Sequence, residues 1–90
     1  MQRQVLHEST VKVLALLDRL TEDVDRNPAV TTSQMAKTWR EINGKKNGNI
    51  PRSMRRLIQS GMVREAYGTR PNHPLYQLTA NGYRYLANNK

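Results

Sequence analysis

Residues 50–60 carry the side chains whose types and spacing could do chemistry. The segment holds Arg52, Arg55, Arg56 and Gln59 and contains no acidic residue. Arginine can form a bidentate pair of hydrogen bonds with O6 and N7 of guanine, and glutamine can do the same with N6 and N7 of adenine. An α-helix fits the major groove of B-DNA, where base pairs are distinguishable. The segment therefore predicts a helix that reads base pairs, because an ordinary solvated helix face would mix acids with bases.

A helix over this segment would turn the polar side chains outward and its apolar side toward a core. Pro51 suits the first helical turn, and Gly61 suits the position just past the last one. At about 100° per residue, Met54, Leu57 and Ile58 form the inward stripe. The candidates for base reading on the opposite and flanking sides are Arg52, Ser53, Arg56 and Gln59.

Basic and polar residues on both sides of this helix are candidates for phosphate contacts. Lys45 and Lys46 lie in a turn rich in Gly and Asn, for which a merely solubilising role is the alternative. Residues 62–66 and 75–79 are predicted strands joined by a loop over 67–74. An arginine at the tip of such a hairpin can enter a minor groove or pair with phosphate. The candidates are Lys45, Lys46, Arg55, Arg64, Thr69, Arg70, Asn72 and His73. For the histidine, an ordinary loop position is the alternative.

The charge is unevenly distributed along the chain. Residues 1–42 hold six basic and six acidic groups, whereas residues 43–90 hold nine basic groups against one acid, Glu65, and carry the whole net charge of +8. A neutral half joined to a basic half indicates a polyanionic partner for the basic half, with a generally soluble basic surface as the alternative. We expect that partner to be double-stranded DNA.

The N-terminal part is predicted to form a long amphipathic helix over residues 4–24, ended by Asn27-Pro28. Its main apolar stripe follows a 4-3-4-3-4 spacing and comprises Leu6, Thr10, Val13, Leu17, Leu20 and Val24. A second strip, Val11, Leu14 and Ala15, faces another direction. We favour a dimer partner for this second strip. The alternatives are burial of both strips within one chain, or weak exposure of the second.

A second helix is expected after Thr32, a good N-cap residue. Met35, Trp39 and Ile42 recur at i, i+4 and i+7 on its core side. This register favours a core position for Trp39 over a stacking platform for single-stranded bases. Val30-Thr31 just before it could form a short strand.

The last element is a short helix capped by Thr79, with Tyr83, Leu86 and Ala87 at i, i+3 and i+4. The resulting order is helix, short strand, helix, helix, strand, strand, helix. This mixture of helices with a hairpin predicts an α+β fold.

Composition limits the other possibilities. Ninety residues suit one small domain, 1–90, and the chain has no cysteine. The two histidines, His7 and His73, lack metal-ligand spacing, and the basic half offers only Glu65 as a carboxylate. We therefore expect no metal, no cofactor, no catalytic residues and no enzymatic activity.

The longest apolar run, Val13–Leu17, has five residues, whereas a membrane span needs about 20. Charged residues interrupt the N-terminal apolar stretch, so a signal peptide is not expected. These features suggest a cytoplasmic protein, or a nuclear one in a eukaryote.

Two motifs resemble those of winged helix-turn-helix regulators of the MarR and PadR families. The stretch Ser53–Val63 (SMRRLIQSGMV) is similar to their recognition helix, which ends in L-x-x-x-G-L-V. Tyr76–Gly82 (YQLTANG) is similar to the Y-x-L-T-x-x-G that follows their wing. Thr32–Ala36 resembles the start of their second helix, so the likeness covers residues 31–86.

The resemblance implies a winged helix-turn-helix: a three-helix core with a two-stranded β-hairpin wing, a long N-terminal helix and a short C-terminal helix. It places the recognition helix at about 50–60 and the wing at about 62–79. It also implies a transcriptional regulator, in particular a repressor, that binds operators as a homodimer built on the terminal helices. The candidates for the dimer interface are Val11, Leu14, Ala15, Tyr83 and Leu86.

The chain departs from these families in two places. The turn before the recognition helix is longer and more basic than usual, and the closing helix is shorter. The shorter closing helix shifts the dimer contacts to the first helix, and the small size fits a minimal regulator from a virus, a plasmid or a prokaryote. The alternative function is a winged-helix adaptor that binds DNA without reading its sequence or docks on protein. A regulator would show a specificity ratio of about 10³–10⁷, and a coating protein a ratio near one.

Overall fold

A computed structural model describes residues 6–23, 25, 29–44, 49–66 and 74–88. Its elements are α1 (Glu8–Leu20), α2 (Thr32–Asn43), α3 (Ile50–Gln59), β1 (Val63–Glu65), β2 (Tyr76–Leu78) and α4 (Ala80–Asn88). The two strands form an antiparallel hairpin directly after α3. This layout confirms the predicted α+β winged-helix fold.

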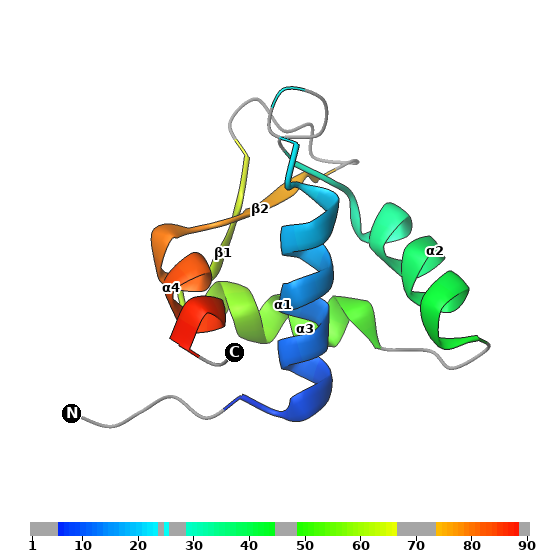
Figure 1. Cartoon of the computed structure of the whole chain (residues 1–90), viewed down its shortest axis with the longest axis horizontal. Helices are drawn as coiled ribbons and strands as arrows, with labels where there is room; N and C mark the ends of the chain where they lie inside the picture. Colours follow the sequence, from blue (N-terminus) through cyan, green and yellow to red (C-terminus); the bar gives the residue numbers. More distant parts are fainter. Residues whose placement is uncertain (1–5, 24, 26–28, 45–48, 67–73, 89–90) are drawn as a thin grey trace.

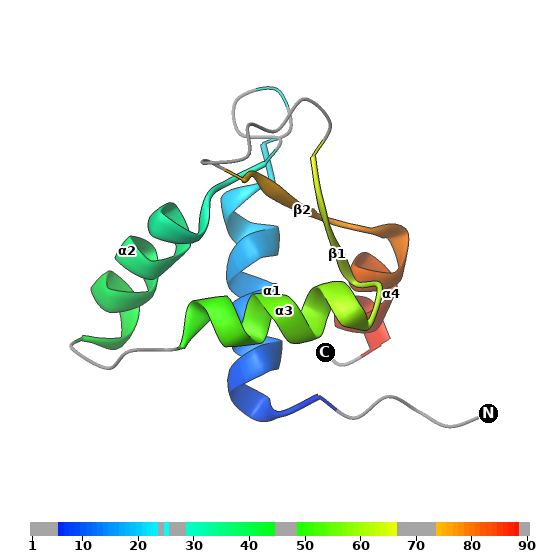
Figure 2. The ribbon, with the colours of Figure 1, turned by 180° about the vertical axis from the view of Figure 1, so that it is seen from behind.

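Helix α1 occupies the centre of the molecule. In Figure 1, α1 lies in front of α3, with α2 on one side and α4 and the hairpin on the other. Figure 2, the view from behind, shows α3 in front of α1. Helix α1 contacts all three other helices and β2. The buried hydrophobic core draws on every element except α4 and is formed by Val13, Leu14, Leu16, Leu17, Val30, Met35, Trp39, Ile50, Met54, Leu57, Met62, Val63 and Leu78.

Helix α1 is shorter at both ends than the predicted span of 4–24. It begins after His7, whose Nδ1 accepts a hydrogen bond from the backbone N–H of Ser9 at 3.2 Å and so caps the helix. It ends before Thr21, whose hydroxyl donates to the carbonyl oxygen of Leu17 at 2.8 Å. Both ends are therefore fixed by side chains that satisfy backbone groups left open at a helix terminus.

The predicted second strip on α1 is not a continuous exposed surface. Leu14 is fully buried within the single chain, so its assignment to a dimer interface is wrong. Ala15 is exposed and Val11 is half-buried. Leu16, which belongs to neither predicted strip, is also buried. The reason is the central position of α1, which gives it neighbours on several sides and buries a broad arc of its surface.

Helix α2 begins one residue earlier than the predicted cap implies, because Thr31 and not Thr32 is its N-cap. The Thr31 hydroxyl accepts a hydrogen bond from the backbone N–H of Gln34 at 3.2 Å, and the Gln34 side chain accepts one from the Thr31 N–H at 2.9 Å. This reciprocal capping box requires Gln or Glu three residues after the cap. Of the two neighbouring threonines, Thr31 has Gln34 at that spacing, whereas Thr32 has Met35.

The buried side of α2 covers fewer turns than its apolar pattern predicts. Met35 and Trp39 are buried as predicted, but Ile42 is exposed, because the last turn of α2 extends past the core. Before the helix, Val30 forms an isolated antiparallel bridge with Tyr76 of β2 through hydrogen bonds of 3.0 and 2.7 Å. This bridge is the short strand pairing expected near residue 30. The predicted helix stop at residues 27–28 lies outside the described residues.

The junction between α3, the hairpin and α4 is tied together by Thr79. As predicted, it caps α4: its hydroxyl accepts from the backbone N–H of Gly82 at 3.2 Å, and it also donates to the carbonyl oxygen of Gly61 at 2.6 Å. A Cβ atom at Gly82 would collide with the backbone carbonyl oxygen of Met62. The absence of a side chain at Gly82 therefore lets α4 lie directly on the start of the hairpin.

That close contact sets the rotation of α4. Gly82 faces inward, and so do Tyr85 and Leu86, at i+3 and i+4, which pack partly buried against the core. Tyr83 and Ala87, which the apolar spacing placed with Leu86, are exposed instead.

Candidate nucleic-acid interface

Helix α3 is held firmly by its inner side. Ile50, Met54 and Leu57 are almost completely buried. Ile58, predicted to share this stripe, is exposed, because it lies about 100° around the helix from Leu57. Gly61 follows the helix with φ +75°, the left-handed conformation expected of a glycine past a helix end.

The outer side of α3 presents Arg52, Arg55, Arg56 and Gln59, all of them exposed. We call these four residues the α3 basic face. Their exposure is what the helical spacing predicts. Within the described residues, no acidic side chain forms an ion pair with its arginines, whereas on α1 Lys12 pairs with Glu8.

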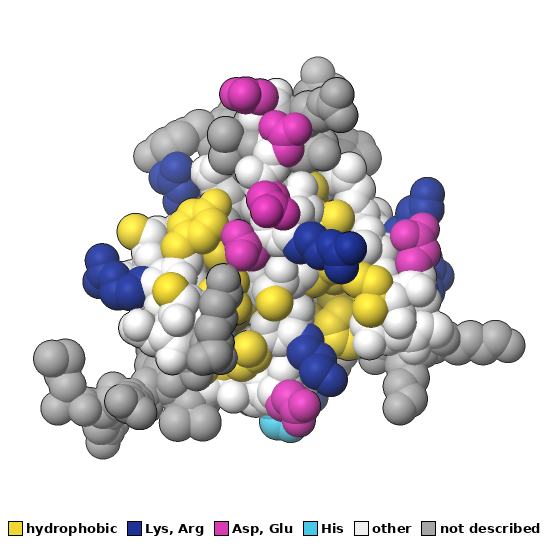
Figure 3. Space-filling model, in the orientation of Figure 1, with side chains coloured by type: hydrophobic (Ala, Val, Ile, Leu, Met, Phe, Trp, Pro, Cys, Tyr) yellow, Lys and Arg dark blue, Asp and Glu magenta, His cyan; other side chains and the backbone are white. Residues whose placement is uncertain are grey.

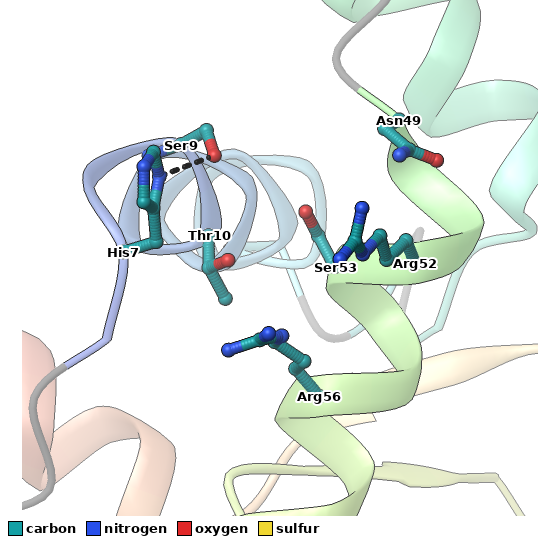
Figure 4. Close-up of a pocket in the computed structure, with 7 residues that line it drawn as sticks. All are labelled: His7, Ser9, Thr10, Asn49, Arg52, Ser53 and Arg56. Carbon is teal, nitrogen blue, oxygen red and sulfur yellow. Dashed lines mark hydrogen bonds between the residues drawn. The ribbon is translucent and has the colours of Figure 1, made fainter.

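Ser53 does not belong to this face. It is only 5% exposed, which corrects its placement among residues free to reach base edges. Together with two arginines of the α3 basic face it instead lines a hollow of about 280 Å³ between α3 and the N-terminal turn of α1 (Figure 4). The lining residues are His7, Ser9, Thr10, Asn49, Arg52, Ser53 and Arg56. We call this feature the α1–α3 hollow.

The sequence contains one signal for this hollow. Arg52, Ser53 and Arg56 follow one another at i, i+1 and i+4, so they share one flank of α3. Which element faces that flank is a tertiary fact: α1 and α3 contact each other along this side. Thr10, predicted as a core position of α1, lies there as well.

The face of the molecule opposite α3 has a different character. Figure 3 shows acidic side chains gathered over and around α1, mixed with basic and hydrophobic ones. In this orientation α3 lies behind α1 (Figures 1 and 2). The uneven charge along the chain thus becomes an uneven charge in space, with the α3 basic face turned away from these acids.

The described part of the hairpin adds one exposed cation. Arg64 of β1 is exposed and pairs in register with Gln77 of β2. Beside this pair, Glu65 lies opposite Tyr76. Burial, and secondarily the negative charge of Glu65, raise the pKa of the Tyr76 hydroxyl above its usual value. The remaining candidates lie outside the described residues and are Lys45, Lys46, Thr69, Arg70, Asn72 and His73.

A second hollow, of about 320 Å³, lies between α1 and α2. Its walls include the apolar side chains of Ala15, Leu16 and Ile42, and it is also lined by Trp39. The indole N–H of Trp39 is buried and has no hydrogen-bond partner among the described residues. Sequence reasoning placed Trp39 in the core correctly but did not anticipate this hollow.

Two structural absences concern the described residues. Among them, no three or more His, Asp or Glu side chains come together in a group that could hold a metal ion. None of their helices combines the length and apolar character needed to cross a membrane.

Comparison with known proteins bears on the fold. Neither a scan of protein-family models nor a search of curated proteins gave a match. Among solved structures, the chain is similar to SSV1 F-93, with a TM-score of 0.63 and 17% sequence identity over 97% of this chain and 87% of that one. At this identity the likeness concerns the fold, and it agrees with a winged helix over nearly the whole chain.

Proposed function

We propose that this protein binds double-stranded DNA in a sequence-specific manner and regulates transcription, with α3 in the major groove and the hairpin against the backbone or the minor groove. The observation that carries this proposal is the α3 basic face. Three arginines and a glutamine project from a ten-residue helix whose opposite side is buried, and no described acid neutralises them. A rigidly held helix with this outer side suits direct reading of base edges.

Gln59 is the best candidate for a base contact. It lies nearly opposite the buried stripe of α3, about 140° around the helix from Met54, 160° from Leu57 and 180° from Ile50. A bidentate contact from its amide to adenine would distinguish one base pair by about 1–3 kcal/mol.

A role as a cytoplasmic repressor is supported by the resemblance of Ser53–Val63 and Tyr76–Gly82 to MarR and PadR regulators. Homodimer formation is part of the proposal, with Ala15 and Tyr83 as its exposed apolar residues; Tyr83 is 47% exposed. Val11 and Leu86, both partly buried, would lie at the edges of such an interface.

Selection of bound sites from a random duplex library at near-physiological salt tests the proposal. We expect an enriched inverted repeat with half-sites about one helical turn apart, as a two-fold symmetric dimer requires. Gln59→Ala should lose preference at one base pair of each half-site and retain the others. An enriched single half-site would contradict dimer formation but not sequence-specific DNA binding. Salt-sensitive retention of DNA without any enriched motif would contradict the regulator and support the architectural alternative.

A further inference from the structure

The α1–α3 hollow is lined by the hydroxyl groups of two buried residues, and these hydroxyls have no hydrogen-bond partner among the described residues. Thr10 is 3% exposed and Ser53 is 5% exposed, yet both line the hollow. Figure 4 shows their hydroxyl oxygens directed into the space between the two helices. Neither hydroxyl is hydrogen-bonded to another described residue. A hydroxyl that opens into such a space and has no partner in the described residues is available to hydrogen-bond an acceptor inside the hollow.

Two arginines supply positive charge to the same space. Arg52 and Arg56 line the hollow from α3, and Figure 4 shows the guanidinium of Arg56 reaching toward α1. The nearest acid along α1, Glu8, does not line the hollow, and its carboxylate lies 3.7 Å from Lys12 Nζ. The electrostatic character of the hollow is therefore cationic.

The N-terminus of α3 opens beside these groups and strengthens that character. No side chain caps this helix. The positive end of its dipole attracts an anion.

We propose that the α1–α3 hollow binds one phosphate group. Guanidinium groups and hydroxyls converge on it from two different helices, which suits an anion with oxygens in several directions better than a planar carboxylate. The volume of about 280 Å³ lies just below the range of about 300–1,000 Å³ for drug-sized ligands, so it fits a phosphate with an attached sugar. The phosphate comes either from a DNA backbone or from a small phosphate ester.

The case in which DNA supplies the phosphate rests on the proposed function. In that case the polar side chains of α3 have two different roles. Arg52 and Arg56, which the sequence pattern assigned to bases, hold a backbone phosphate together with Ser53 and Thr10. Gln59 remains for base edges. The phosphate held between α1 and α3 then fixes the depth and register of α3 in the groove, because phosphate contacts position a protein on the duplex.

The test uses a double variant, Thr10→Val with Ser53→Ala, which removes both hydroxyls and keeps the shape of the side chains. The matched control is Ser33→Ala with Thr38→Val, the same two changes on α2 outside the hollow. Thermal unfolding of both proteins verifies that each folds, and Ser53→Ala alone replaces the double variant if that protein is unfolded.

The first measurement is titration of the folded proteins with inorganic phosphate, followed by the backbone amide NMR signals of residues 9, 10, 52 and 53, with chloride at matched ionic strength as the reference. We expect saturable shifts for the wild type and the control. The hollow variant should bind about tenfold more weakly, as expected for lost hydrogen bonds to a charged group.

The second measurement uses the best-binding duplex with its phosphates replaced one at a time by neutral methylphosphonate. If DNA is the source, one replacement per bound chain lowers wild-type affinity about tenfold and leaves the affinity of the hollow variant unchanged. If inorganic phosphate binds saturably but no methylphosphonate replacement distinguishes the wild type from the hollow variant, the hollow is assigned to a small phosphate ester.

Two outcomes separate this proposal from the proposed function. Absence of saturable phosphate shifts, together with an identical methylphosphonate profile for wild type and hollow variant, overturns the phosphate site even if the protein selects a DNA sequence. Failure to bind any duplex overturns the proposed function, whereas saturable phosphate shifts lost in the hollow variant still establish the site.

Discussion

The outer faces of α1 and α3 rest on the same core but differ in electrostatic character, mixed on α1 and purely basic on α3. The exposed side of α1 holds Glu8, Lys12, Ala15 and Arg19, and the side chains of Glu8 and Lys12 lie within ion-pair distance. On α3 the exposed side holds three arginines and a glutamine with no acid among them. Solubility alone does not require a cluster of charges of one sign, since a surface with mixed charges is also soluble. The difference supports the proposal that α3 faces a polyanion, whereas α1 faces solvent.

The largest effect should come from the buried side of α1. Leu14→Ala should lower the free energy of unfolding by about 2–5 kcal/mol, because it removes a fully buried side chain and leaves a cavity. Its neighbour Ala15 is exposed, and Ala15→Ser should change stability by less than about 0.5 kcal/mol. Urea unfolding followed by circular dichroism measures both. A small loss for Leu14→Ala, accompanied by dissociation of a dimer in sedimentation, would restore Leu14 to an interface and contradict its burial in one chain.

The next effect concerns the junction that holds the end of α3. Gly82→Ala should destabilise the protein by about 1–3 kcal/mol, since the added methyl group overlaps the backbone carbonyl oxygen of Met62, which cannot move without shifting β1. Asn81→Ala, an exposed change one residue away, is the control. If Gly82→Ala is as stable as Asn81→Ala, α4 does not pack this closely on the hairpin, and the orientation of α3 must be fixed by the core alone.

A matched pair of arginines tests the comparison of the two faces directly. Arg55 on α3 and Arg19 on α1 are both exposed and carry the same charge. Arg55→Ala should weaken duplex binding and reduce the slope of log K against log salt by about 0.9, the value for one lost phosphate contact. Arg19→Ala should leave both quantities unchanged. Fluorescence anisotropy with a labelled duplex at several salt concentrations measures them, and equal losses for the two variants would mean that only net charge matters.

The sequence was sufficient to predict those features that depend on the spacing of residues along one helix or on a cap at a helix end. The buried positions Met54 and Leu57 and the exposed arginines of α3 follow from 100° per residue. Gly61 and Thr79 were predictable because a helix end needs a particular backbone conformation or acceptor at one position. The motif glycine, Gly82, was visible in the sequence, but its reason, the carbonyl oxygen of Met62, was not.

The features that sequence reasoning missed depend on what packs against a helix. The spacing of Leu14 indicates burial but does not say whether the same chain or a second one covers it. Ile42 has core periodicity but lies on a turn of α2 that extends past the core. The α1–α3 hollow combines Thr10 with Ser53, two residues far apart in the sequence, and only the contact between the two helices brings them together.

The smallest effect should come from the ion pair on α1. Glu8 precedes Lys12 by four residues, the favourable orientation, and both side chains are largely exposed. A double-mutant cycle with Glu8→Ala and Lys12→Ala should give a coupling free energy of about 0.2–0.5 kcal/mol at low salt, and 1 M salt should abolish it because exposed charges are screened. Neither change should weaken duplex binding. Loss of binding in Lys12→Ala comparable to that in Arg55→Ala would extend the interface onto α1 and remove the distinction between the two faces.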